Sequence, residues 1–535
     1  MKKPKVVELN PEEMDSLKCR IQNNELTEMD RTLFLKLLEF CLWLQFQLQE
    51  AKLSIKRLCG LFGISSEKSN RLPQKEASKK EKPLLPEELE QEFKDLEKES
   101  NSLPKKKSKR LKESDYTGAE NIHLPHDSLK AGDPCPTECG GRLYALKPGA
   151  VIRLTGHPIA SAKRYIYERL RCALCGEVFK ATPPGEKYDS KLKAVLSLCK
   201  YYMGLPFFRM ERMQTLLGVP LPDATQWDLV EQVANCLYPI FIYLETLAAE
   251  GNIIQNDDTK VRILSLIQEN KQEPERKRKG MQTTGILSHV QGRKIALFYS
   301  GRDHSGENMT DLLLLRPGEM GPPQQMCDAL PANVPKETKT ILCNCLAHAR
   351  RKFFEIYSAY PEPCGKVIQW IAFVYRIDTL AKKKCLNPEE RLKLHQKWSK
   401  PVMDSLKIWL DEQINDALVE PNSSLGKAIE YCRKRWTELT QFLRLPGALL
   451  DNNLQEQALK IPIRNRKNAM FYKTEHGALV GDILISIIYN CELSKENPID
   501  YLVAIQENRK AVRQSPEDWL PWNYNQQLNP QECAA

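Results

Sequence analysis

The stretch NIIQND, Asn252–Asp257, decides the fold prediction, because it opens a series of short segments rich in β-branched residues and ends on an acid. The segments KVRILSL, MQTTGILSHV, RKIALFYS, QQMCD and TKTILCN follow within residues 260–344, and each has the composition of a strand. LAHARRKFFEIYSAY then has a helical pattern, residues 362–444 are almost wholly helical, and the helical pattern resumes after Asp451. This order predicts a mixed sheet flanked by helices, with a long helical insertion.

The whole chain is too long for one core. Its 535 residues predict roughly three or four domains, and 41% hydrophobic residues suffice for globular ones. The net charge of +10 permits a polyanionic partner. The 17 cysteines are mostly scattered, which fits a reducing cytosol. The start, MKKPKVVELNPEEMD, lacks the apolar region of a signal peptide. LFLKLLEFCLWLQFQL carries Lys36 and Glu39 and is too short to span a bilayer, so we expect a soluble intracellular protein without membrane contact.

The N-terminal region contains a heptad pattern of apolar residues that spans about three repeats. Its members are Leu37, Cys41, Leu44, Leu48, Ala51, Ile55 and Leu58. A coiled-coil dimer and an amphipathic helix packed on its own domain explain the pattern equally well. The charged, proline-punctuated residues 67–131 follow and predict a linker with one short helix near Pro86–Ser100. We interpret its cluster KKKSKR, Lys105–Arg110, as a solvated tether.

Two cysteine pairs, each followed by glycine, come next in CPTECGG and CALCG. The pairs are Cys135 with Cys139 and Cys172 with Cys175, and RLYALK and RYIYERLR between them alternate like short strands. Because Zn²⁺ prefers four tetrahedral ligands and each pair can supply two, the layout predicts a zinc ribbon with a structural or DNA-docking role. Four buried cysteines are the alternative, and the first pair departs from the usual two-residue spacing.

Residues 185–250 have a helical pattern. FFRMERMQTLLGVPLPDATQWDLVEQVANCL predicts a helix, a Gly/Pro turn and a second helix that begins near Asp223 or Thr225. A helix-turn-helix and an ordinary helical hairpin share this pattern. The second helix lacks basic residues, which argues against direct DNA reading by it.

Acids fall at the ends of two predicted strands and at the start of a predicted helix. Asp257 and Asp258 end the first strand, Asp328 ends QQMCD, and Glu456 lies in the first turns of the helix after the insertion. Such acids can converge on one edge of a sheet, and carboxylate oxygens are what Mg²⁺ prefers. Two such ions about 4 Å apart can promote attack on a phosphodiester. Strand-end acids are common, however, and Asn453 with Glu456 can equally form a helix-capping box.

Several stretches, in order along the chain, carry a resemblance to a known family. They are LCGLFGISSEK, CPTECGG with RCALCG, KAVLSLCKYYMGLPFFRMERMQTLLGVPL, NDDT, CLAHARRKFFE, and DNNLQEQALK with RNRKNAMFYKTEHGALVGDILISIIYNCELSKENPIDYL. The chain resembles the insertion sequence 66 family of transposases, of the DDE class, over roughly Cys135 to Leu502. DNNxxE followed by RKN and GA is the most specific part. The resemblance implies a catalytic domain with a ribonuclease-H-like fold.

The resemblance also implies the site. Asp257 matches the first acid, Asp328 the second and Glu456 the glutamate, and together they are expected to bind Mg²⁺ or Mn²⁺ and to be catalytic. Asp258 stands where the family has Asp or Glu, so we expect it not to be the primary ligand. Many members have Asp-Gly-Tyr at the second acid, whereas this chain has CDALPAN.

Histidines near the acids have two readings each. CLAH, Cys345–His348, resembles a Cys-x-x-His found after the second acid in several DDE families. It could hold metal, but two ligands do not make a zinc site, so we expect a buried pair that braces the helix against the sheet. His304 could lie near the site, and a structural role is the simpler expectation.

Basic residues near the acids are candidate phosphate contacts, with a solvated basic face as the equal alternative. They are Arg350, Arg351, Lys460, Arg464, Arg466, Lys467 and Lys473. The resemblance implies DNA as partner, both the inverted repeats of an element and target DNA. It also implies a homo-oligomer that holds two ends, small accessory proteins of the same element, and a location in the bacterial cytoplasm with the nucleoid.

Three functions therefore compete. An active DDE transposase would cleave strands at the ends of its insertion sequence and join the 3′ ends to target DNA by metal-dependent transesterification. A catalytically silent DNA-binding protein of transposase descent is the main alternative, and a metal nuclease that never joins strands is the third. The sequence does not give the repeat recognised, the target preference, the oligomer number or the segment that reads bases.

The predicted architecture is a multidomain α+β protein. Its parts are an N-terminal amphipathic or coiled-coil helix (1–66), a charged linker (67–131), a zinc-ribbon-like domain (132–184), a helical domain (185–250), a ribonuclease-H-like mixed α/β catalytic domain (251–361 and 446–475), a helical insertion (362–445) and a C-terminal element and tail (476–535).

Overall fold

A computed structural model describes residues 159–166, 184–273, 275 and 278–528, the backbone of 169–171 and 178–180, and residues 16, 20, 27–30, 32 and 33 near the N-terminus. The heptad helix, the charged linker and the four cysteines of the predicted zinc ribbon lie outside the described residues. Next to the latter, β1 (Arg169–Arg171) pairs antiparallel with β2 (Val178–Lys180), in agreement with the strand expected in RYIYERLR.

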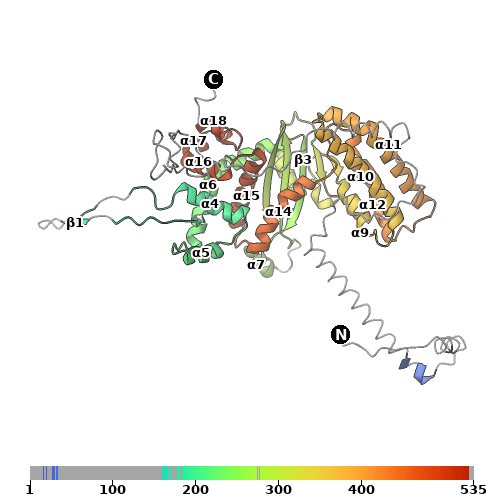
Figure 1. Cartoon of the computed structure of the whole chain (residues 1–535), viewed down its shortest axis with the longest axis horizontal. Coiled ribbons are helices and arrows are strands. Elements are labelled where there is room, and N and C mark those ends of the chain that lie inside the picture. The colour runs from blue at the N-terminus through green and yellow to red at the C-terminus, as the bar shows by residue number, and fades with distance from the viewer. Residues whose placement is uncertain are drawn as a thin grey trace, which may run out of the picture. The chain divides into compact units, whose positions relative to one another are not determined.

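A five-stranded mixed sheet forms the centre of the fold (Figure 1). Its strands are β3 (Ile253–Lys260), β4 (Gln282–Val290), β5 (Arg293–Gly301), β6 (Gln324–Cys327) and β7 (Ile341–Asn344), in the spatial order β5-β4-β3-β6-β7. The first three strands run antiparallel, and β6 and β7 run parallel to β3. The prediction of a mixed α/β fold is therefore confirmed.

One predicted strand is wrong. KVRILSL does not form a strand, because β3 already extends to Lys260 and α7 (Leu264–Gln272) begins four residues later. Ile263 and Leu266 are instead buried in a small separate core with Val261 and Ala478. A β-branched run that packs as a turn and first helical turn has the same local composition as a strand.

The two faces of the sheet carry different helices. Thr284 and Ser288 of β4 point toward α8 (Ser305–Leu314) and the end of α6 (Asp223–Ala249), where the Ser288 hydroxyl donates to Ala248 O at 2.6 Å. Gly285, between them, faces α14 (Asn453–Ala469). A Cβ on Gly285 would lie 2.1 Å from Gln455 Nε2, so glycine lets α14 lie close against β4.

Helix α15 (Glu475–Ser494) covers the free edge of β5. The outward amides of alternate β5 residues, Ala296, Phe298 and Ser300, donate to side chains one helical turn apart on α15. The acceptors are Asn490 Oδ1 (3.0 Å), Ser486 Oγ (3.0 Å) and Asp482 Oδ2 (2.6 Å). The helix thus satisfies an edge that would otherwise invite pairing with another chain.

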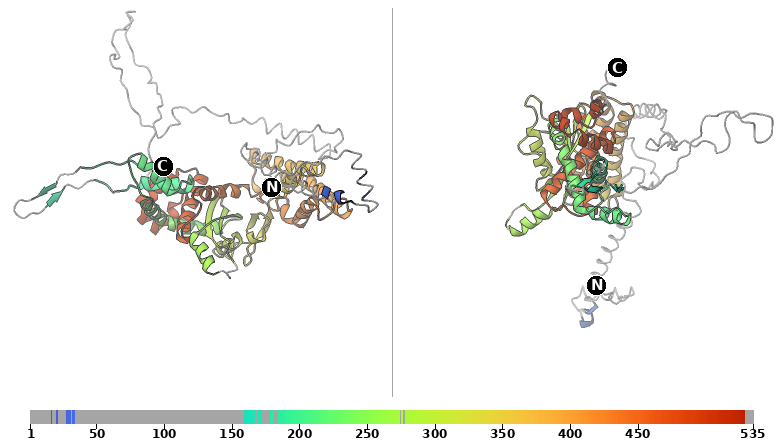
Figure 2. Two further views of the ribbon diagram at one scale, coloured as in Figure 1. Left: turned by 90° about the horizontal axis from the view of Figure 1, so that it is seen from below. Right: turned by 90° about the vertical axis from the view of Figure 1, so that its left-hand side faces the viewer.

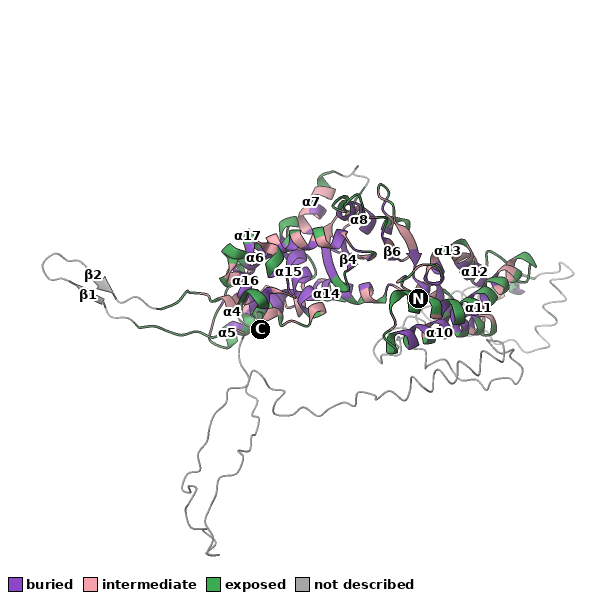
Figure 3. Cartoon of the chain, turned by 90° about the horizontal axis from the view of Figure 1, so that it is seen from above, coloured by how far each residue is buried: buried purple, intermediate pink, exposed green. Residues whose placement is uncertain are grey.

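Helix α15 is also the one helix among the described residues that is long and apolar enough to cross a membrane. Its apolar window is 78% buried within the protein (Figure 3). Because its polar residues bind β5, we interpret it as a core helix.

Helices that precede the sheet in the sequence and helices that follow it complete this part of the core. Before the sheet come α4 (Ser190–Ser197), the π-helical turn η3 (Leu198–Tyr202), α5 (Phe207–Leu216) and α6; after it come α16 (Pro498–Glu507), α17 (Arg509–Gln514), η6 (Pro516–Trp519) and α18 (Tyr524–Leu528). The helix–turn–helix pattern of α5 and α6 is confirmed as a pair of helices. Leu229, Val230, Val233 and Leu237 of α6 are buried in the main core, which makes α6 a core helix and favours the hairpin interpretation.

The residues predicted to form a helical insertion are helical. It comprises α10 (Pro361–Lys383), α11 (Pro388–Asn415), α12 (Ser424–Lys434), α13 (Trp436–Leu439) and η5 (Gln441–Leu443), and lies beside the β6–β7 end of the sheet (Figure 2). Its interior holds a buried carboxylate, Asp378, which contacts Arg391 at 2.7 Å and Lys382 at 2.7 Å. Burial raises the pKa of Asp378, but a hydrogen bond from His395 and the two cations outweigh it and hold this pKa below its usual range. Helix α9 (Leu346–Glu355) joins β7 to the insertion.

Candidate active site

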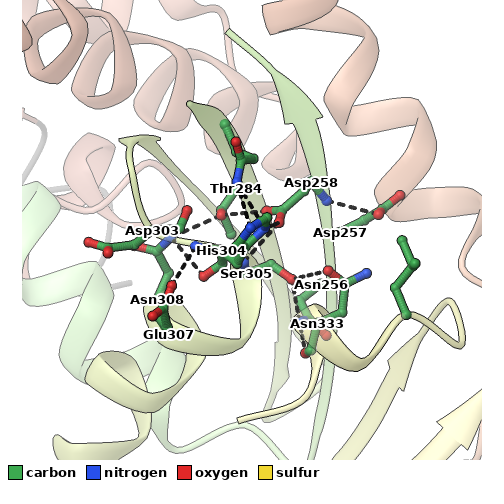
Figure 4. A network of polar contacts seen from close by, with 12 residues as sticks. Asn256, Asp257, Asp258, Thr284, Asp303, His304, Ser305, Glu307, Asn308 and Asn333 are labelled. Atoms are coloured by element: carbon green, nitrogen blue, oxygen red, sulfur yellow. Dashed lines mark hydrogen bonds and ion pairs between the residues drawn. The ribbon is translucent and has the colours of Figure 1, made fainter. Parts of the chain in front are cut away.

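The two adjacent acids of β3 face opposite sides of the sheet, as strand alternation requires. Asp258 points into a polar network (Figure 4). Its Oδ1 accepts from Thr284 Oγ1 at 2.7 Å, and its Oδ2 accepts from Ser305 N at 3.0 Å and lies 3.1 Å from His304 Nδ1. An acid at a helix N-terminus is electrostatically favourable. Asp258 therefore anchors α8 to β3, on the face away from Asp257.

Residue His304 belongs to the same anchor. It precedes α8, its main-chain N–H donates to Glu307 Oε2 at 2.9 Å, and its ring contacts Gln282 Nε2 at 2.9 Å. The expectation of a structural histidine fits this position.

Asp257 lies on the α14 face, where carboxyl groups from three elements come together. Burial, together with the charges of Asp328, Glu456 and Asp258, raises the pKa of Asp257 to about 7, although a hydrogen bond from Asp258 N opposes the rise. That bond, from Asp258 N to Asp257 Oδ1, is 2.8 Å long. Asp328 and Glu456 thus lie close enough for their charges to act on Asp257. The three carboxyl groups are not, however, among the clusters of described residues whose potential metal-ligand atoms all lie within 4.8 Å of one another.

Sheet register explains the place of Asp328. Gln255 of β3 pairs with Met326 of the parallel strand β6, so residues 257 and 328, two positions further on, stand at the same level and on the same face. Asp328 Oδ1 accepts from Leu330 N at 3.2 Å and from the side chain of Asn333.

Asn333 is a residue that the sequence reasoning missed. It is buried at the end of η4 (Pro331–Asn333), and its main-chain oxygen accepts from Asn256 Nδ2 and Gln325 Nε2, both at 2.7 Å. Asn333 therefore links Asp328, which its side chain contacts, to strand β3, which its main-chain oxygen contacts. The segment CDALPAN, which departs from the Asp-Gly-Tyr of many family members, uses its last residue for this link. The buried polar position had no signal in the sequence.

Glu456 lies in the first turn of α14, and the predicted capping box is wrong. Asn453 is the first helical residue and is exposed, and Asn452 precedes the helix without a side-chain cap. Asn452 is instead fully buried: its Nδ2 donates to Asn256 O at 3.1 Å and its main-chain N–H points at Cys345 Sγ at 3.4 Å. Tertiary bonds, rather than a local cap, therefore set where α14 begins and where Glu456 projects.

The Cys345–His348 pair lies beside Glu456. Cys345 is fully buried at the start of α9, and the bond from Asn452 N supports its predicted bracing role. His348 Nε2 lies 3.7 Å from Glu456 Oε1.

The predicted phosphate contacts divide into two groups. Lys460, Arg464 and Lys467 are exposed. Starting from Glu456, each follows the previous residue by four, four and three positions, so all of them lie on the same side of α14. The guanidinium of Arg464 nevertheless lies 5.6 Å from the centre of the Tyr202 ring. Lys473 is exposed just after the helix.

The remaining three candidates are also engaged within the protein. Arg350 is only 9% exposed and its guanidinium lies over the Phe354 ring, so its prediction as a phosphate contact is corrected. Arg466 donates to Thr259 Oγ1 at 3.2 Å and to Lys260 O, which joins α14 to the end of β3. Arg351 Nη1 lies 3.4 Å from His348 Nε2.

These features define a mixed α/β protein with an acidic centre of the kind that suits divalent cations. The family described as Transposase IS66 family matches residues 186–479, more than half of the chain and all of the centre. This chain belongs to the IS66 family of transposases.

Relatives in Sinorhizobium fredii agree with this. The uncharacterized protein y4hP is 27% identical over 369 residues, which are 64% of this chain and 64% of that protein. The uncharacterized protein y4jD is 33% identical over 187 residues, 34% of this chain and 36% of that protein. The chain thus spans less than two thirds of the length of these relatives.

Proposed function

We propose that this chain is a DDE transposase, with Asp257, Asp328 and Glu456 as its catalytic carboxylates. Family membership supports the class of activity. The observations that support the residue assignment are geometric. The register of β3 and β6 sets Asp328 beside Asp257, and Glu456 stands in the first turn of α14, the helix that packs on the same face of the sheet.

The catalytic domain that we propose is ribonuclease-H-like. Two features support it: the first acid stands on the central strand β3, and the second stands at the end of the parallel neighbour β6. The helical segment that the sequence pattern predicts separates both from Glu456 in the chain.

The acid centre suits Mg²⁺ or Mn²⁺, which we propose as cofactors. Hard cations prefer carboxylate oxygens, and a cation relieves the repulsion that raises the pKa of Asp257. Asp257, Asp328 and Glu456 would hold the ions. Bound there, the ions would lower the pKa of an attacking water or hydroxyl and neutralise charge on the leaving oxygen of a phosphodiester. The strand-borne acids and the bonds of Asn333 and Asn452 keep the carboxylates in fixed positions.

The exposed side of α14 gives a path for DNA. Lys460, Arg464 and Lys467 extend along the helix from Glu456, and successive residues four apart are about 6 Å apart along the axis. That spacing approaches the distance between neighbouring phosphates of one strand. We propose that this row positions the strand whose phosphodiester lies at the acid centre.

The remaining partners are proposals from the family resemblance. Two element ends must be held together, which favours a homo-oligomer, with small accessory proteins of the same element and a location at the bacterial nucleoid. Cys135, Cys139, Cys172 and Cys175 are proposed to bind one Zn²⁺ in a ribbon. Metal analysis that finds this ion and its loss on Cys172→Ser would support the ribbon.

The decisive experiment is strand cleavage and joining with purified protein, labelled element ends, target DNA and Mg²⁺ or Mn²⁺. Asp257→Asn, Asp328→Asn and Glu456→Gln should each abolish both steps. Asp404→Asn on α11 is the matched control. The side chain of Asp404 is 54% exposed and forms an ion pair with Lys400, and none of the three acids lies near it in the sequence.

The outcomes separate the alternatives. Undiminished cleavage by a folded Asp257→Asn or Glu456→Gln protein rules out the proposed site. Cleavage without joining by the parent protein indicates a metal nuclease. Tight binding of element ends with neither step indicates a catalytically silent DNA-binding protein.

A further inference from the structure

Three side chains of metal-ligating types converge beside the acid centre. Cys345 stands immediately before α9, His348 lies in its first turn, and Glu456 lies in the first turn of α14. Their potential ligand atoms all lie within 4.8 Å of one another. The sequence showed only two ligands, Cys345 and His348, and the fold adds the third from a distant segment.

The polar atoms of this cluster are incompletely satisfied. Glu456 Oε1 and His348 Nδ1 are buried atoms without a hydrogen-bond partner among the described residues. The 3.7 Å between Glu456 Oε1 and His348 Nε2 is too long for a hydrogen bond. A buried polar atom without a partner destabilises the fold, so an arrangement with two such atoms favours an additional ligand.

We propose that Cys345, His348 and Glu456 form a site for a thiophilic divalent cation, Zn²⁺ in the first instance. A thiolate, an imidazole and a carboxylate are all ordinary zinc ligands, and three protein ligands leave one position of a tetrahedron for water. A sulfur and a nitrogen ligand disfavour Mg²⁺. The site is thus distinct in chemistry from the oxygen-only centre of Asp257 and Asp328.

Arg351 and Asn452 lie next to the proposed ligands and affect how a cation could bind there. Arg351 Nη1 lies 3.4 Å from His348 Nε2, and since Arg351 is partly exposed, its guanidinium must turn toward solvent. Asn452 N already points at Cys345 Sγ, and a main-chain amide stabilises a metal-bound thiolate.

The ion would fix the orientation of Glu456 through the oxygen that lies near His348. A carboxylate has two oxygens, so Glu456 can join both sites. The inference concerns metal binding alone and does not depend on transposase activity.

The test is a Co²⁺ titration of the metal-free full-length protein, followed by the near-ultraviolet thiolate-to-cobalt charge-transfer band and by metal content. Other cysteines of the chain can contribute, so the comparison is between variants. Cys345→Ser and His348→Ala should each lose one equivalent of tightly bound Co²⁺, and Cys345→Ser should also lose its part of the band.

Cys343→Ser is the matched control, because Cys343 is equally buried on β7 and its thiol lies 3.7 Å from Ile341 O, outside the cluster. This variant should retain the full stoichiometry and band. A folded Cys345→Ser protein with unchanged metal content overturns the proposal. If Cys345→Ser fails to fold, His348→Ala decides, since His348 is partly exposed: unchanged content in that variant overturns the proposal in the same way.

Two different measurements distinguish failure of this cation site from failure of the proposed function. Asp257→Asn should abolish strand cleavage and leave the Co²⁺–thiolate band intact. Loss of the band on Cys345→Ser therefore supports the cation site whether or not the protein cleaves DNA.

Discussion

The side-chain amide of Asn452 donates to the main-chain oxygen of Asn256 at 3.1 Å, and this bond joins the start of α14 to the strand position next to Asp257. Glu456 stands one helical turn after Asn452, and its main-chain N–H donates to Asn452 O at 3.0 Å. The position of Glu456 relative to Asp257 therefore depends on the buried side-chain amide of Asn452.

Replacement of Asn452 by leucine should lower the rate of strand cleavage while the protein remains folded. Leucine fills a similar volume but leaves the main-chain oxygen of Asn256 unpaired, and α14 loses its tie to β3. We expect strand cleavage to fall about 10- to 100-fold, because misplacement of a reacting group by about 1 Å is enough for such a loss. Cleavage rates and circular dichroism of the same preparation measure the two effects.

The neighbouring amide provides the control. Asn453 is exposed and its main-chain N–H bonds Asp451 Oδ1 at 3.1 Å, so Asn453→Ala should leave cleavage within about twofold, in line with surface substitutions generally. Equal losses for both substitutions would argue that Asn452 has no special part in placing Glu456.

The same pair of residues shows what local sequence can and cannot predict. The sheet and the helical insertion followed from strand composition and helical periodicity, because both are local properties. The start of α14 did not, because a local capping rule favoured Asn453 while buried bonds to Asn256 and Cys345 select Asn452. Asn333 was invisible for the same reason, since its value lies in contacts with other strands.

The edge helix α15 is a second such case. Its sequence DILISIIYN has an apolar pattern, and the polar residues Asp482, Ser486 and Asn490 have no evident purpose until β5 is placed beside them. Convergence of the three acids was likewise suggested by strand ends but depended on the family resemblance, since acids at strand ends are common.

Divalent cations should stabilise the folded protein through the acid centre. A cation that binds the native state at 100 times its Kd adds about 2.7 kcal/mol to the free energy of unfolding. Thermal unfolding with and without Mg²⁺ or Mn²⁺ should show a rise in Tm for the parent and for Asp404→Asn, but none for Asp257→Asn. A full rise in the Asp257→Asn variant would place the cations elsewhere.

The row of cations on α14 should contribute to DNA affinity without sequence preference. Lys460→Ala, Arg464→Ala and Lys467→Ala should each weaken binding of any duplex and lower the slope of log K against log salt by about 1, the value for one phosphate contact. Binding titrations at several salt concentrations measure this. Lys434→Ala, which removes an exposed cation from the end of α12, serves as the comparison, and an equal drop in slope there would assign the effect to net charge alone.

The buried carboxyl of Asp482 should make the stability of the protein depend on pH. Burial raises the pKa of Asp482 to about 8 in the folded state, although Ser300 donates to it from its main-chain N–H and its hydroxyl. In the unfolded chain the group titrates near the ordinary aspartate pKa of 3.8. As the pH rises between these values the unfolded state loses its proton while the folded state keeps it, so stability is lost across this window.

Asparagine has the same shape without the proton, and its amide can donate to the Ser300 hydroxyl while its oxygen accepts from Ser300 N. The free energy of unfolding of the parent, relative to Asp482→Asn, should therefore fall by about 5 kcal/mol between pH 4 and pH 8. Urea unfolding at a series of pH values measures the difference, and Asp404→Asn controls for the loss of an exposed carboxylate. A parent-to-variant difference that stays constant from pH 4 to pH 8 would mean that Asp482 is ionised in the folded protein throughout.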